Sequence, residues 1–509
     1  MLKYLIILKN IRFQEEKLME IIDYISLYWL IIKLMTFFTV IILFISGIDD
    51  FFIDVYYWIR RGFKSSIGEE KYPNISTQEL IRHPEKPLAL MVPAWDEAVV
   101  IEKMLLNTLK TFQYDNLHIF VGTYPNDPAT QEKVDNVTAI HHNVHKVINK
   151  TPGGTTKADC LNNVIDYIFE YEKSSGIEFI TITYHDSEDI VHPMELKLAN
   201  YIIGTEGKDL MQIPVMPLTT NPLNFNGTHY QDEFIETGFK DMLVRESISG
   251  YVPSSGVATS FSKRAIATLS RLNNGIVFNT KSLTEDYDIG YRLLSEGLKL
   301  AFVTFPVKVR KKVKTWYGAI EEREVEEYIV SKGYFPTKFL QAYRQKSRWM
   351  VGIIFQGHRD IGWPKGLGLK YILYRDRKAI FTHPANLFAY IIMFNLIYLS
   401  LTYHFNDEAW HFPEFIPEDS WLWTLIYCNA IFLISRFFHR FYFINKFYGF
   451  SSAILSIPRL IWGNIVNLFA LVRAFSQYRD SKKGTVKKEV KWDKTDHEFP
   501  DEIEIAKVA

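Results

Sequence analysis

The chain has 509 residues and a formal net charge of zero, because 58 Lys and Arg side chains balance 58 Asp and Glu side chains. This balance argues against a protein that binds nucleic acid through bulk positive charge. Hydrophobic residues make up 48% of the chain and charged residues 23%, which excludes an intrinsically disordered protein. The two cysteines, Cys160 and Cys428, can build neither a disulfide framework nor a cysteine-based zinc site.

Long apolar stretches predict membrane segments. Residues 28–47 are long enough to cross a bilayer, and residues 385–403 and 419–438 form two further candidate spans. A cleaved signal peptide is the rival interpretation of the first stretch, but the apolar run is too long and no small-residue cleavage site follows it. Polar residues interrupt a fourth stretch, 452–472, which we therefore expect to be interfacial or re-entrant.

The charges beside these stretches predict the topology. Basic residues follow the first span at 60–64, the loop 404–418 has no Lys or Arg, and the loop 436–450 holds three basic residues. By the positive-inside rule, the region after the first span and the tail after Arg473 should be cytoplasmic. Three spans satisfy these signs, whereas a fourth would place the tail outside. Four basic residues before the first span oppose the rule.

A long region, 62–384, alternates short apolar runs with helical patterns. This alternation is typical of a mostly parallel α/β sheet covered by helices on both faces. Ligands of such sheets bind at the carboxyl ends of the strands, so the loops there are the expected place for chemistry. The runs that predict buried strands are 88–93, 117–122, 178–184 and 299–304.

Acidic residues follow two of these strands. The loop Pro93–Glu97 places two acids after the first strand, which a capped helix start explains equally well. After the strand 178–184 comes His185-Asp186-Ser187-Glu188-Asp189, in which three carboxylates within four residues repel one another. Solvent exposure would relieve this repulsion. A divalent cation with oxygen ligands would relieve it too, because Mg²⁺ takes one or two carboxylates together with substrate phosphates.

Two later motifs carry further candidate residues. Leu283-Thr284-Glu285-Asp286 predicts a helix start capped by Thr284, with the helix ending near Gly297. An acid at that position is either a favourable charge on the helix dipole or a positioned general base. Gln345, Arg348 and Trp349 share one face of a predicted helix, where they form either a sugar-binding surface or ordinary packing.

The order and spacing of these motifs resemble a family-2 glycosyltransferase with a GT-A fold, of the membrane-bound processive cellulose and hyaluronan synthase type. More narrowly, VPAWDEAVVI, YPNDPATQEKV, HDSEDIVHPMEL and WDKTDHEFP resemble the phage-adsorption protein B group of bacterial inner-membrane glycosyltransferases. The resemblance covers nearly the whole chain, from about residue 28 to residue 500. It implies an α/β catalytic domain of the Rossmann-like GT-A type, cytoplasmic and embedded between transmembrane and interfacial helices.

The resemblance also implies roles for individual residues. Asp186 and Glu188 match a DxD-type motif for Mg²⁺ or Mn²⁺, with Asp189 as an additional ligand, and Asp286 matches the catalytic base beside Glu285. The acceptor-binding residues implied are Gln345, Arg348 and Trp349. The donor-binding residues implied are Pro93, Ala94, Asp96, Glu97, Asp127, Lys157, Trp492, Lys494 and Thr495. One loop departs from the family, because Thr123–Asp127 replaces the usual Asp-Asp-Gly-Ser.

The implied function is inverting transfer of a sugar from a nucleotide-diphosphate donor, expected to be a UDP-sugar, to a growing polysaccharide at the bacterial inner membrane. The implied partners are the donor, a sugar-polymer or lipid-linked acceptor, the lipid bilayer and an outer-membrane export protein. Two alternatives stay open: glycosylation of a lipid carrier, and a non-enzymatic membrane receptor or scaffold for phage adsorption. Intact acidic motifs argue against the second alternative.

The expected domain organisation has six parts. In chain order, they are an N-terminal span with an amphipathic interface segment (1–61), the GT-A core (62–320), acceptor-site and interface helices (321–384), a transmembrane helix pair (385–438), interfacial or re-entrant helices (439–480), and a cytoplasmic tail with a WDKT gating-like segment (481–509).

Overall fold

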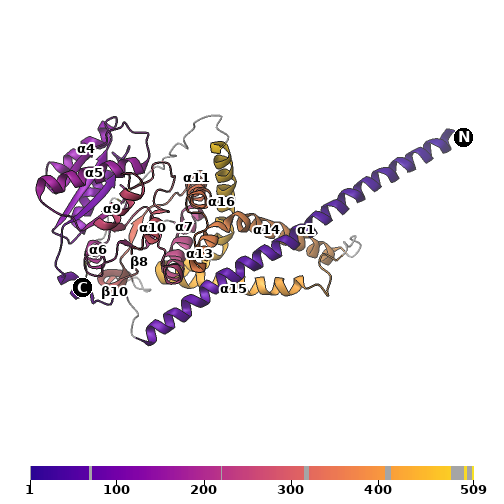
Figure 1. Ribbon diagram of the computed structural model, residues 1–509. Coiled ribbons are helices and arrows are strands. Elements are labelled where there is room, and N and C mark those ends of the chain that lie inside the picture. Colours follow the sequence, from indigo (N-terminus) through magenta and orange to yellow (C-terminus); the bar gives the residue numbers. More distant parts are fainter. Residues whose placement is uncertain are drawn as a thin grey trace. The chain divides into compact units, whose positions relative to one another are not determined.

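The computed structural model describes residues 2–67, 72–218, 221–314, 320–406, 414–482, 498–500 and 507–508. The described residues fall into two compact units, each made of segments that are distant in sequence. Met1–Phe52 and Lys378–Phe437 form a helical unit, and Ile53–Arg377 and Phe438–Ala509 form an α/β unit (Figure 1).

The main sheet of the α/β unit has seven strands in the described part of the chain, in the order β3-β2-β1-β4-β7-β5-β8. Neighbouring strands from β3 to β4 are parallel, β7 is antiparallel to both β4 and β5, and β5 is parallel to β8. The predicted mostly parallel sheet is therefore confirmed. The strand bounds are β1 Leu88–Pro93, β2 Leu117–Thr123, β3 Val144–Ile148, β4 Thr181–Tyr184, β5 Leu210–Gln212, β7 Thr259–Ser262 and β8 Leu300–Phe302.

Helices cover both faces of this sheet, as expected for parallel strands joined by crossovers. Side chains alternate along β1, so Leu90 and Val92 belong to one core cluster, whereas Ala89 and Met91 belong to another. Figure 1 shows the helices around the sheet. They are α3 Ile101–Thr111, α4 Pro128–Thr138, α5 Lys157–Ser175, α6 Glu195–Gly204, α9 Lys263–Leu272 and α10 Ile289–Ser295.

Smaller sheets and short helices complete the α/β unit. β9 (Pro306–Lys314) pairs antiparallel with β10 (Ile320–Tyr328) on one side and with β12 (Lys507–Val508) on the other. β6 (Val215–Pro217) pairs with β11 (Ser331–Gly333). The other elements are α2 Thr77–Arg82, α7 Phe225–Glu236, η1 Thr237–Asp241, α8 Met242–Ser249, α11 Phe339–Met350, η2 Val351–Gln356, α12 Gly357–Ile361, α13 Leu367–Arg377 and α16 Phe450–Lys482.

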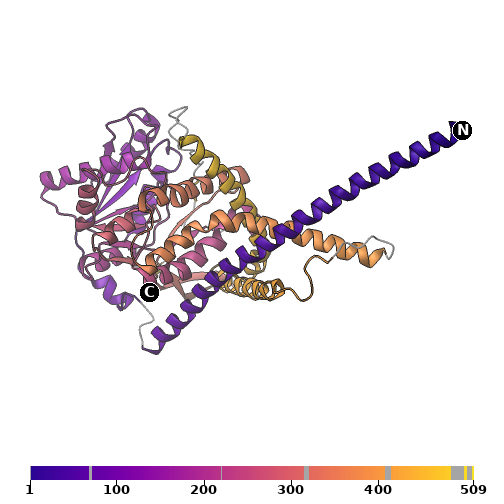
Figure 2. The ribbon, with the colours of Figure 1, turned by 45° about the vertical axis from the view of Figure 1, so that its right-hand side comes forward.

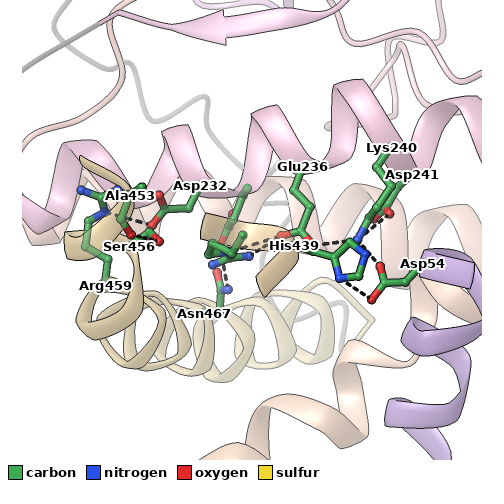
Figure 3. A network of polar contacts seen from close by, with 12 residues as sticks. Asp54, Asp232, Glu236, Lys240, Asp241, His439, Ala453, Ser456, Arg459 and Asn467 are labelled. Carbon is green, nitrogen blue, oxygen red and sulfur yellow. Dashed lines mark hydrogen bonds and ion pairs between the residues drawn. The ribbon is translucent and has the colours of Figure 1, made fainter. Parts of the chain in front are cut away.

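Buried ion pairs hold α7 and η1 against their neighbours in the α/β unit (Figure 3). Asp232 on α7 pairs with Arg459 on α16 at 2.7 Å, and both side chains are completely buried. Farther along, Glu236 pairs with Arg440 at 3.0 Å, and Lys240 pairs with Asp54 at 2.7 Å. Charges this deep are stable only when paired and hydrogen-bonded, so these contacts specify which elements lie beside α7.

The described residues contain four helices that are long and apolar enough to cross a membrane, by length and composition. The first lies within α1 (Leu2–Ser66), which Figure 2 shows as one continuous helix. The next two are α14 (Ala379–Phe405) and α15 (Leu422–Tyr448). The fourth lies within α16, whose Arg459 is buried against Asp232. The interfacial placement of 452–472 and the predicted domain boundaries stay predictions.

A close backbone approach beside α10 gives a test of this packing. A methyl group at Gly290 would lie 1.9 Å from the backbone oxygen of Val252, whereas a methyl at Gly62 on α1 would meet nothing within 4 Å. Because backbone cannot move aside as a side chain does, Gly290→Ala should destabilise the protein by about 1–3 kcal/mol. The measurement is the melting temperature of the full chain in detergent, with Gly62→Ala as control. Equal melting temperatures for the two variants would contradict the packing.

Candidate active site

The loops after β1 and β2 are joined through Asp127. Its Oδ2 accepts a hydrogen bond from the backbone N–H of Asp96 at 2.6 Å, and its Oδ1 accepts one from Thr130 at 3.2 Å, which caps α4. Ala94 donates its backbone N–H to the oxygen of Gly122 at 2.8 Å. The predicted donor-binding residues Pro93, Ala94, Asp96, Glu97 and Asp127 therefore come together at the carboxyl ends of neighbouring strands.

The loop that departs from the family, Thr123–Asp127, closes onto residues 151–155. Asn126 Oδ1 accepts the backbone N–H of Gly153 at 2.5 Å. A methyl group at Gly153 would lie 1.7 Å from the indole of Trp95, so this position requires glycine. Trp95 packs edge-on against Tyr124, with ring centroids 4.9 Å apart. The loop Thr123–Asp127 therefore carries side chains that differ from the Asp-Asp-Gly-Ser pattern, but it is still packed against its neighbours.

Lys157 connects two of the predicted motifs. Thr156 caps α5, so Lys157 is the first residue of that helix, and its ammonium forms an ion pair with Asp186 in the loop after β4. The same ammonium donates to the backbone oxygen of Gly256 at 2.7 Å. Burial alone would lower the pKa of Lys157, but the charges of Asp186 and Glu285 outweigh burial and hold the pKa above its ordinary value. Lys157 is therefore a permanent cation.

Asp286 lies in the same half-buried cluster of charges. Burial and the neighbouring charge of Glu285 raise the pKa of Asp286 to about 7, while Lys157 opposes the shift. Burial also raises the pKa of Glu285. The backbone of Gly256 packs closely against the Asp286 carboxylate, since a methyl group at Gly256 would lie 2.6 Å from Asp286 Oδ2. The structure thus brings the acids of two distant motifs together around one lysine.

The acids of the loop after β4 point in different directions. Asp186 and Glu188 are both half-buried, and Glu188 accepts a hydrogen bond from the hydroxyl of Ser187 at 3.2 Å. Asp189 is buried and faces His185, whose Nδ1 lies 2.8 Å from Asp189 Oδ2. Burial by itself would lower the pKa of His185, but the charges of Glu195 and Asp189 raise it to about 10.

The prediction that a helix opens at Thr284 is wrong, because α10 begins at Ile289 and residues 284–288 form turns before it. Tertiary contacts occupy the groups that a helix start would use. Leu283 donates its backbone N–H to Gln356 Oε1 at 2.9 Å, and Thr284 donates its own to Ser282 Oγ at 3.2 Å. The Thr284 side chain packs against Gly352, leaving no room for a methyl group there. Glu285 and Asp286 therefore lie on a turn that η2 supports.

The predicted acceptor residues lie on α11, near the acidic cluster. The positive charge of Arg348 opposes the raised pKa of Glu285, which shows that the two motifs interact. Trp349 is half-buried and contacts Tyr230 and Phe234, with ring centroids 6.1 Å and 6.0 Å away. Gln345 Oε1 is buried without a hydrogen-bond partner among the described residues.

The predicted donor-binding residues Trp492, Lys494 and Thr495 lie outside the described residues. Conversely, sequence reasoning missed Gly256, which contacts both Lys157 and Asp286. The turn-forming run Pro253-Ser254-Ser255-Gly256 marks a loop in the sequence, but nothing there indicates what the loop covers.

Comparison with known proteins decides the family. The family model described as "Glycosyl transferase family group 2" matches residues 181–406, which contain the Asp186, Asp286 and Arg348 motifs. The chain carries a family-2 glycosyltransferase domain. The mannosyltransferase PcManGT from Pyrobaculum calidifontis, solved with GDP-Man and Mn²⁺, is structurally similar, with a TM-score of 0.51 and 13% identity over 89% of this chain and 99% of that one. At this identity, the similarity supports the GT-A fold.

Two curated relatives match the chain along most of its length. Bacteriophage adsorption protein B of Escherichia coli K12 and bacteriophage N4 adsorption protein B of Escherichia coli O157:H7 are each 44% identical over 463 residues. The match covers 90% of this chain and 61% of each relative, so the chain spans less than two thirds of their length. These findings support the predicted resemblance to the family-2 glycosyltransferases, and the apolar helices together with these relatives indicate association with a membrane.

The position of Lys157 makes a prediction about pH dependence. Because its ammonium lowers the pKa of Asp286, Lys157→Met should raise that pKa above about 7. If Asp286 acts only when deprotonated, the acid-side limb of the rate against pH should move up by about one pH unit. The measurement is donor turnover by the purified full chain from pH 5 to pH 9.

The matched control is Lys150→Met, because Lys150 is exposed and pairs with Asp166 at 3.4 Å. If the acid-side limb of the pH–rate profile lay at the same pH in Lys157→Met and in the control, Lys157 would not influence the group whose ionisation controls the rate.

Proposed function

We propose that this family-2 glycosyltransferase moves a sugar from a nucleotide-diphosphate donor to a growing polysaccharide at the bacterial inner membrane, with inversion at the anomeric carbon. The observation that carries the proposal is the half-buried cluster in which Lys157 lies among Asp186, Glu285 and Asp286. Acids from distant motifs meet at the carboxyl edge of the sheet, where α/β folds bind their ligands.

Asp286 has the properties of the general base. An acceptor hydroxyl is a weak nucleophile and needs a base whose pKa lies near the working pH. The pKa of Asp286, raised to about 7, meets that need. As the hydroxyl oxygen bonds to the anomeric carbon, its proton passes to Asp286, and the bond from that carbon to the diphosphate oxygen breaks. This single displacement inverts the configuration. Glu285 and Lys157 set the electrostatics of the base.

Asp186 and Glu188 are suited to hold Mg²⁺ or Mn²⁺. Among the described residues, no group of three or more His, Cys, Asp or Glu side chains is placed to hold a metal alone. Two carboxylates with donor phosphates completing the shell are what Mg²⁺ commonly takes. The ammonium of Lys157 against Asp186 indicates that this carboxylate already attracts positive charge. When bound, the cation would stabilise the charge on the leaving diphosphate. PcManGT, which was solved in complex with GDP-Man and Mn²⁺, supports this assignment.

The acceptor belongs beside α11. Gln345 offers a buried carbonyl oxygen without a partner among the described residues, and Arg348 acts electrostatically on Glu285. Trp349 supplies a half-buried aromatic surface held by Tyr230 and Phe234. We assign these residues to the sugar at the end of the acceptor chain, which must reach Asp286 for proton transfer.

The donor, a UDP-sugar in this proposal, binds at the loops after β1 and β2, with Trp492, Lys494 and Thr495 from the tail. The catalytic domain faces the cytoplasm.

Substitution of the base tests the reaction directly. Asp286→Asn keeps the shape of the side chain but cannot take a proton, so turnover should fall by about 10²–10⁴-fold while nucleotide binding stays close to wild type. The measurements are donor turnover and nucleotide affinity in the purified full chain. The control is Asp288→Asn, since Asp288 is half-buried like Asp286 but pairs with Arg292 at 3.2 Å. A variant that mainly loses nucleotide affinity would instead place Asp286 in donor binding.

Removal of divalent cations tests the metal assignment. Treatment with EDTA should abolish turnover, and Mn²⁺ or Mg²⁺ should restore it, because the leaving diphosphate needs a counter-charge. Analysis of the product then separates a long polymer from a glycosylated lipid. Full turnover in a metal-free preparation would remove the cation from the proposal. No turnover of any nucleotide sugar would favour the receptor or scaffold alternative.

A further inference from the structure

A buried bridge of three side chains, Asp189, His185 and Glu195, lies directly behind the metal loop 186–189. His185 Nδ1 lies 2.8 Å from Asp189 Oδ2, and His185 Nε2 lies 2.7 Å from Glu195 Oε1. The side chains of His185 and Glu195 are completely buried, and that of Asp189 is 8% exposed. Since each ring nitrogen faces a carboxylate oxygen, the imidazole donates from both nitrogens.

The carboxylate of Asp189 is turned inward by these contacts. The Oδ2 atom that accepts from His185 also accepts the backbone N–H of Asp186 at 3.0 Å. Its Oδ1 atom lies on the side of Gly333, where a methyl group would come within 3.8 Å. The backbone N–H of Asp189 in turn donates to the oxygen of Asp186 at 3.2 Å, which closes the turn. Asp189 therefore shapes the backbone that carries Asp186.

Both ends of the bridge rest on fixed structure. Glu195 is the first residue of α6, where the helix dipole favours a carboxylate. Just after the loop, Ile190 exchanges two backbone hydrogen bonds with Lys332, at 2.7 Å and 2.9 Å. The loop 186–189 is thus pinned at both sides, while Asp186 and Glu188 remain half-buried and accessible.

We propose that Asp189 is a positioning residue and not a metal ligand: with His185 and Glu195, it fixes loop 186–189 so that Asp186 and Glu188 present their carboxylates to the cation. This inference rests on the metal site of the proposed function. Partners behind the ligands commonly control metal affinity in this way, by about 10–100-fold.

A pair of substitutions at Asp189 separates the two roles. Asn keeps an oxygen that can accept from His185 and from Asp186, and the charge of His185 stays paired with Glu195. Asp189→Asn should therefore bind Mn²⁺ within about fivefold of wild type, because a neutral acceptor makes a hydrogen bond about half as strong. Asp189→Ala removes both bonds and should bind Mn²⁺ about 10–100-fold more weakly. Glu188→Gln, which changes a ligand, should lose affinity as strongly.

The bridge itself is tested from its far end. Glu195→Gln and His185→Gln should weaken Mn²⁺ binding by about tenfold or more, although neither residue can reach the cation. The matched control is His192→Gln, since His192 is a buried histidine of the same segment whose Nδ1 accepts the backbone N–H of Met194. This control should keep the wild-type affinity for Mn²⁺.

The readout is Mn²⁺ binding by electron paramagnetic resonance, on the full chain in detergent with UDP as the probe nucleotide. Melting curves identify variants that fail to fold, and Asp189→Asn keeps the test decisive if Asp189→Ala does not fold. If Asp189→Asn lost as much Mn²⁺ affinity as Glu188→Gln, Asp189 would be a metal ligand. That result would overturn this inference and leave the proposed function standing. Wild-type affinity in Asp189→Ala would overturn it as well. Failure of the wild-type chain to bind Mn²⁺ would remove the metal site, and the inference with it.

Discussion

The ion pair between Lys157 and Asp186 is the interaction on which the site depends. Burying several carboxylates together is unfavourable, because each loses its hydration and each repels the others. The Lys157 ammonium offsets part of this cost for Asp186, Glu285 and Asp286 at once. Because Lys157 begins α5, which follows β3, and Asp186 follows β4, the pair also ties together two crossovers of the sheet. This one contact therefore both stabilises the acidic cluster and connects two crossovers of the sheet.

Local pattern alone predicted β1, β2, β4 and β8, whereas it missed the buried strands β5 and β7 as well as β3. β1 begins and ends where the apolar run LALMVP does, and β2 extends its predicted run by one residue. The pattern failed at β3, because the sequence VHKVI mixes a histidine and a lysine with the apolar residues. β3 lies at the edge of the sheet and is only partly buried, so it lacks the continuous hydrophobic signal of a central strand.

The residues of the site can be recognised from local sequence motifs, but the contacts between them cannot. The acids Asp186 and Asp286 stand out in the sequence, and the family resemblance gave them roles before any fold was known. Their meeting around Lys157 and Gly256 depends on residues about 30 to 130 positions apart, which no periodicity reveals. The helix start expected at Thr284 failed for a related reason, since Gln356 and Gly352 compete for that segment from a distant part of the chain.

The buried ion pairs of α7 and η1 constrain which substitutions this sequence can accept during evolution. Asp232 faces Arg459 on α16, Glu236 faces Arg440 on α15, and Lys240 faces Asp54 on α1 (Figure 3). Loss of Asp232 or Arg459 leaves an uncompensated charge in the interior, at a cost of about 3–5 kcal/mol. The other two pairs form one network, because Lys240 also pairs with Glu236 at 2.7 Å. Single changes at these positions are therefore selected against, and tolerated changes come in pairs. In relatives of this protein, the two members of each pair should covary across more than a hundred residues of sequence separation, recording in the sequence which helices pack against α7.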